Sequence, residues 1–104
     1  MLVDVTAAPT FTARPKVELH LHLDCSLTRS ALHRLGNPIG EAEFRRLYTA
    51  PERCDSLMDY LRAIGPSCEA LQTAPALTIA MDELLRALAA DGVIYAEIRF
   101  APHT

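Results

Sequence analysis

The sequence predicts an α/β fold in which two parallel strands are joined by several helices. Apolar and polar residues alternate over 17–24, helical periodicity runs over 75–91, and an apolar, β-branched stretch follows at 93–101. Strands joined by helices are expected to pair in parallel through a right-handed crossover and to be covered on both faces. At 104 residues the chain is too short for a complete large barrel or doubly wound sheet.

The composition limits the classes of partner. Half of the residues are hydrophobic and 22% are charged, which is typical of a globular protein. The net charge is −3 and Lys and Arg do not cluster, so nucleic acid is not an expected partner. The three cysteines form no CxxC pair, which argues against a disulfide framework. No secretory signal and no apolar run of membrane-spanning length is present, so we expect a cytoplasmic protein without a membrane partner.

The first half of the chain predicts a leader, a strand and three helices. Residues 1–14 have no clear periodicity and predict an extended leader before the domain at 15–104. A strand is expected at 17–24, and a helix follows at 28–35 between the N-cap Thr28 and Gly36. A second helix is expected at 41–48. A third begins near residue 55 and is interrupted at Gly65-Pro66, although 67–72 could resume it.

The second half predicts the longest helix and a closing strand. Proline in the first turn and glycine after the end bound a helix at 75–91. Its apolar stripe is Leu77, Met81, Leu84, Leu85 and Leu88. The strand at 93–101 is apolar except for Glu97 and Arg99, and we expect a structural role in which Arg99 forms a buried ion pair with Glu18 or Glu97.

His20 and His22 are the first candidates for chemistry. Two residues apart on a strand, they point the same way with Cα atoms about 6.5 Å apart, so both imidazoles can reach one metal ion. Glu18 and Asp24 belong to the same polar alternation. The alternative is the solvated face of a half-exposed strand. We favour metal binding because a row of ionisable groups in a strand covered on both faces needs pairing or a metal.

Asp24 ends this row at the carboxyl end of the strand, where parallel α/β folds bind ligands. It could contact a substrate or orient a metal ligand. The alternative is that its carboxylate caps the segment that follows.

Two segments carry a resemblance to a known family. Residues 15–24, PKVELHLHLD, resemble the first barrel strand of the adenosine deaminase family of metal-dependent hydrolases. Residues 92–103, GVIYAEIRFAPH, look like that family's second strand, and the helix from Ser56 to Ile64 matches the position of its apolar lid. The resemblance spans about residues 15–103.

The resemblance implies the N-terminal portion of a (β/α)8 TIM barrel with extra helices between strands 1 and 2. It implies zinc-dependent hydrolytic deamination of adenosine or a related aminopurine, with release of ammonia. His20 and His22 would bind one Zn²⁺, and His22 and Asp24 would contact a purine nucleoside or base. The lid would supply four apolar substrate contacts: Leu57, Tyr60, Leu61 and Ile64.

The resemblance also implies what this stretch lacks. The family's remaining metal ligands and its general acid lie beyond the second strand, so we assign no catalytic residue and expect the 104 residues alone to be inactive. Cys25 stands where most adenosine-specific members have glycine, so the aminated substrate stays open. Two alternatives remain: a hydrolase of the wider amidohydrolase superfamily with another substrate, or a non-catalytic barrel remnant that binds a partner.

Overall fold

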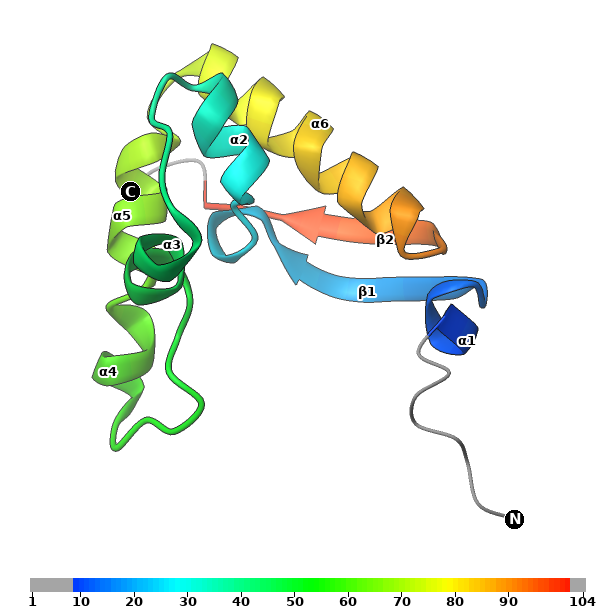
Figure 1. The fold of residues 1–104 in the computed structure, drawn as a ribbon, viewed down its shortest axis with the longest axis horizontal. Helices are drawn as coiled ribbons and strands as arrows, with labels where there is room; N and C mark the ends of the chain where they lie inside the picture. Colours follow the sequence, from blue (N-terminus) through cyan, green and yellow to red (C-terminus); the bar gives the residue numbers. More distant parts are fainter. Residues whose placement is uncertain (1–8, 102–104) are drawn as a thin grey trace.

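The computed structural model describes residues 9–101, which form helices and two strands (Figure 1). The elements are α1 (Pro9–Thr12), β1 (Lys16–His22), the 3-10 turn η1 (Leu23–Cys25), α2 (Arg29–Arg34), α3 (Glu41–Tyr48), α4 (Leu57–Leu61), α5 (Ile64–Ala70), α6 (Ala74–Ala90) and β2 (Val93–Arg99). The mixed helix and strand content of an α/β chain is confirmed. A closed barrel is not part of what these residues form.

The two strands pair in parallel, as predicted. Both arrowheads point toward the side of the molecule where α2 to α5 gather, and α6 runs back alongside β2 (Figure 1). The helices α2 to α5 therefore lie beyond the carboxyl ends of both strands, whereas α6 returns the chain along the sheet. The register shifts between Glu18 and Leu21, so a bulge interrupts the strict alternation expected for the first strand.

The core lies beyond the end of β1 rather than under the sheet. It joins η1, α2, the end of α5 and α6, through the buried residues Leu23, Leu27, Ala31, Leu32, Leu71, Ala80 and Leu84. Burial of a leucine such as Leu32, which is 1% exposed, is favourable by about 1.5–3 kcal/mol. This core fixes the turn that follows the histidines.

The predicted covering of both strand faces is wrong for the part of the chain that the structure describes. Val17 is 58% exposed, Leu19 is 57% exposed and Ile94 on β2 is 74% exposed. The reason is that α6 packs alongside β2, whereas α2 to α5 pack beyond the strand ends and leave these strand side chains uncovered.

Helix ends follow the predicted capping residues closely. The hydroxyl of Thr28 accepts a hydrogen bond from the Ala31 backbone N–H at 3.1 Å, and α2 is followed by Gly36 with φ of +83°. Thr73, which the sequence did not single out, caps α6 in the same way through Ala76 at 3.2 Å. Gly92 follows α6 with φ of +81°.

Two predicted boundaries and one predicted stripe need correction. Residues 9–12 of the expected extended leader form the single turn α1. Gly65-Pro66 does not interrupt a helix, because it lies in the first turn of α5. Backbone N–H groups of a first turn have no partner within the helix, so proline removes no helical hydrogen bond there. On α6 the buried line is Ala76, Ala80 and Leu84, whereas Leu85 of the predicted stripe is 48% exposed.

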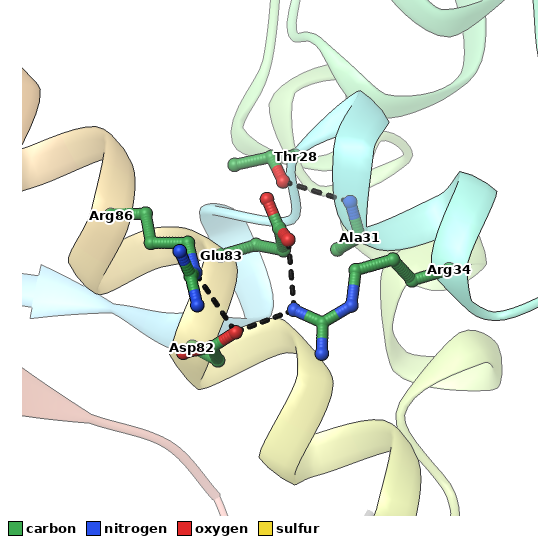
Figure 2. A network of polar contacts seen from close by, with 6 residues as sticks. All are labelled: Thr28, Ala31, Arg34, Asp82, Glu83 and Arg86. Carbon is green, nitrogen blue, oxygen red and sulfur yellow. Dashed lines mark hydrogen bonds and ion pairs between the residues drawn. The ribbon is translucent and has the colours of Figure 1, made fainter.

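Ion pairs join α2 to α6 on the outer surface. Arg34 of α2 donates to Asp82 and Glu83 of α6, and Arg86 donates to the same Asp82 oxygen at 3.1 Å (Figure 2). The guanidinium of Arg34 and then that of Arg86 lower the pKa of Asp82 below its ordinary value.

Among the described residues no helix is both long and apolar enough to span a bilayer.

Candidate metal and substrate site

The imidazole rings of His20 and His22 converge near the carboxyl end of β1. Their Nε2 atoms lie 3.1 Å apart and their ring centroids 5.1 Å apart. Two nitrogens each about 2.0–2.1 Å from one zinc ion at the tetrahedral angle are about 3.3–3.4 Å apart. The donor pair therefore fits a shared metal ion after a small movement.

The expectation that these rings are buried is wrong for residues 9–101. Both histidines are exposed, and 46% of the His22 side chain is accessible. Burial thus gives no argument for a metal here, because solvated imidazoles need no pairing. What favours a metal is the convergence of the two Nε2 atoms.

Two histidines do not complete a metal site. Within the described stretch no group of three or more His, Cys, Asp or Glu side chains is placed to hold an ion. A catalytic zinc site has about three protein ligands and a water molecule. The pair can supply two of these ligands, and the others must come from elsewhere.

Asp24 lies beside the histidine pair but not on the strand. β1 ends at His22, and Asp24 occupies the 3-10 turn η1, so its predicted place in the strand is wrong. The reason is that Leu23 is buried in the core at 1% exposure, which turns the chain out of the sheet. The Asp24 Oδ1 nevertheless lies 3.5 Å from Nδ1 of His22, and it is buried without a hydrogen-bond partner among residues 9–101.

The other charged residues of the strands make different contacts from those predicted. The Oε1 of Glu18 accepts a hydrogen bond from the backbone N–H of His20 at 3.2 Å. Arg99 approaches the Leu19 carbonyl oxygen at 3.5 Å, and Glu97 accepts from the Tyr95 hydroxyl at 3.0 Å. The predicted ion pairs of Arg99 with Glu18 or Glu97 are therefore wrong in this part of the chain.

Three of the four predicted lid residues present apolar surface to solvent. Leu57 is 73%, Tyr60 48% and Leu61 39% exposed on α4, whereas Ile64 at the start of α5 is half-buried. α4 packs on α5, and α5 packs on η1, which carries Asp24. The structure connects the lid to the histidine pair through α5 rather than by bringing the two together.

Cys68 is a neighbour of Asp24 that the sequence did not reveal. It reaches η1 because α5 packs there, and no local spacing relates it to Asp24. Burial raises the pKa of Cys25, and the charge of Asp24 and the nearby Cys68 thiol raise it further. The pKa of Cys68 is raised by burial and then by Asp24. Both thiols stay protonated at neutral pH, which argues against nucleophilic roles, although Cys25 is exposed and does not pack in the core.

The second-strand motif lies partly outside the described residues. Glu97 and Arg99 are in β2, whereas Pro102 and His103 follow the last described residue, Ala101.

The chain is similar to curated adenosine deaminases. It is 41% identical over 93 residues to the adenosine deaminase of Streptococcus thermophilus, an alignment that covers 84% of this chain and 28% of that relative. The adenosine deaminases of Enterococcus faecalis and Streptococcus agalactiae are 40% and 42% identical over 94 and 93 residues, with 85% and 84% of this chain and 28% and 27% of each relative covered.

The chain therefore spans little more than a quarter of the length of these relatives. No family model matches it. No solved structure matches it either. The resemblance inferred from the two strands is confirmed by these relatives, and the coverage is consistent with the N-terminal part of such an enzyme.

Proposed function

We propose that this relative of the adenosine deaminases is the first part of a (β/α)8 barrel that hydrolytically deaminates adenosine or a related aminopurine. The observation that carries the proposal is the 3.1 Å separation of the Nε2 atoms of His20 and His22. Parallel barrels build their sites from residues at the carboxyl ends of strands, and this pair lies near that end of β1.

In the proposed site, His20 and His22 would hold one zinc ion through their Nε2 atoms. The chemistry that such an ion supplies is Lewis acidity, which makes water nucleophilic near neutral pH. The further ligands and the general acid would come from outside the 104 residues. The stretch from 9 to 101 alone is then inactive, because two imidazoles neither saturate zinc nor protonate a leaving amine.

The substrate contacts in the proposal come from the turn and the helices that follow β1. Asp24 and His22 would bind the sugar of a nucleoside, since a carboxylate accepts hydrogen bonds from hydroxyl groups. Leu57, Tyr60, Leu61 and Ile64 would cover the purine. Support for this role is the exposed apolar surface of α4, which would be buried when the flat ring of a purine lies against it.

The test is ammonia release by the full-length protein from adenosine, adenine and other aminopurines. We expect activity with at least one of them, its loss on chelation, and its return with zinc. His22→Ala should abolish activity. His33→Ala, which removes an exposed histidine of α2 outside the pair, should leave it unchanged.

The outcomes separate the alternatives. Ammonia release that survives both chelation and His22→Ala would contradict the zinc proposal. Hydrolysis of another amide or ester, with no ammonia from any aminopurine, would place the protein elsewhere in the amidohydrolase superfamily. A zinc-free and inactive protein would favour the binding module, for which the exposed Val17, Leu19 and Ile94 provide an apolar surface.

A further inference from the structure

We infer that Asp24 is a positioning residue that holds the His22 ring in the tautomer whose Nε2 lone pair faces His20. The inference deepens the proposed zinc site and rests on it for its purpose, although the tautomer exists without a metal. It is motivated by two distances on opposite sides of one ring. Nδ1 of His22 lies 3.5 Å from Oδ1 of Asp24, and Nε2 lies 3.1 Å from Nε2 of His20.

The Asp24 carboxylate is held in place by its turn. Leu23, the residue before it, is 1% exposed and anchors η1 in the core. The hydroxyl of Ser26 donates to the His22 carbonyl oxygen at 2.6 Å, which ties the turn to the end of β1. Only 20% of the Asp24 side chain is exposed, so the carboxylate has little freedom to turn toward solvent.

The Oδ1 of Asp24 needs a hydrogen-bond donor. It is buried and makes no hydrogen bond within the described residues. A buried carboxylate oxygen without a donor is unfavourable, and the imidazole Nδ1 of His22 is 3.5 Å away. A small rotation of either side chain brings the two atoms into hydrogen-bond distance, provided that Nδ1 carries the hydrogen.

The tautomer follows from this contact. A neutral imidazole has one N–H and one lone pair, so a hydrogen on Nδ1 leaves the lone pair of His22 on Nε2. A lone pair on His22 Nε2 can accept a hydrogen bond from Nε2–H of His20, which agrees with the 3.1 Å separation of the two atoms. The opposite tautomer would direct the Nδ1 lone pair at the Asp24 carboxylate, which is repulsive.

This arrangement prepares His22 for a metal ion. Metal-binding histidines commonly donate their second ring nitrogen to a carboxylate, which fixes the ring and increases its basicity. Removal of such a partner typically weakens metal binding by about 10- to 100-fold. Asp24 would have this effect without touching the metal itself.

The test reads the His22 tautomer by long-range ¹H–¹⁵N correlation in the metal-free full-length protein labelled with ¹⁵N-histidine. We expect Nδ1–H in the wild type and a shift toward Nε2–H in Asp24→Ala. Asp24→Asn keeps an acceptor oxygen and should retain the wild-type tautomer. Asp55→Ala removes an exposed carboxylate before α4 and serves as the control. Zinc affinity should fall about 10- to 100-fold in Asp24→Ala only.

Two results would overturn the inference: Nε2–H at His22 in the wild type, or an unchanged tautomer in Asp24→Ala. If Asp24→Ala does not fold, Asp24→Glu replaces it, because the longer side chain displaces the carboxylate. Loss of Nδ1–H at His22 in folded Asp24→Glu supports the inference, and retention of the wild-type tautomer contradicts it. Failure of the zinc proposal looks different. In that case the wild type binds no zinc, while its tautomer still depends on Asp24.

Discussion

Gly92 lies against the carbonyl oxygen of Thr12 so closely that a β-carbon on Gly92 would come within 2.6 Å of that oxygen. The carbonyl oxygen of Arg14 would be 2.8 Å away. Gly92 also accepts a hydrogen bond from the Lys16 backbone N–H at 3.0 Å, and its φ is +81°. Gly92, which follows α6, thus lets the chain rejoin the sheet directly beside the start of β1.

Gly92→Ala should destabilise the fold more than Gly36→Ala does. Both glycines have positive φ, which costs an alanine about 1–2 kcal/mol. Nothing lies within 4 Å of a β-carbon at Gly36, whereas Gly92 adds a clash with two backbone oxygens. Urea denaturation should show the larger loss in free energy of unfolding for Gly92→Ala. Equal losses would mean that α1 does not pack there in solution.

Acid should weaken the fold partly through Asp82. The pKa of Asp82 is lowered in the folded state by Arg34 and Arg86. The ionised carboxylate therefore adds to the free energy of unfolding above its unfolded pKa, and this stabilisation is lost as the pH falls through its folded pKa. Since an ordinary Asp pKa is about 3.9, this loss should occur below about pH 4. Asp82→Asn should flatten that part of a melting-temperature profile. An identical profile would show that the ionised Asp82 carboxylate contributes nothing to stability.

Leu32 and Leu57 should respond differently to the same truncation. Leu32 is 1% exposed in the core, so Leu32→Ala should lower the free energy of unfolding by about 2–5 kcal/mol. Leu57 is 73% exposed, and Leu57→Ala should change it by less than about 0.5 kcal/mol. If α4 covers the substrate, Leu57→Ala should instead raise KM for the aminopurine. An unchanged KM would remove Leu57 from the substrate site.

Local signals predicted most of the helices and strands. Thr28 and Gly36 bound α2 as expected, because capping depends on groups within a few residues of each other. The His20 and His22 pair followed from the spacing on one strand. These features need no knowledge of distant contacts.

Features that depend on distant packing were missed. Asp24 leaves the strand because Leu23 is drawn into a core that α2 and α6 build. Leu85 is exposed because α6 meets this core through Ala80 and Leu84, with Leu77, Met81 and Leu88 packed at its margin, and the apolar stripe alone does not show where that contact ends. Arg34 and Asp82 are 48 residues apart, so only the fold brings them together.

Zinc titration by calorimetry tests the central claim most directly, using the full-length wild type, His20→Ala, His22→Ala and the control His33→Ala. The convergence of two Nε2 atoms predicts one zinc per wild-type chain, loss of that binding in His20→Ala and in His22→Ala, and no change in His33→Ala. Wild-type zinc affinity in both single variants of the pair would contradict the account.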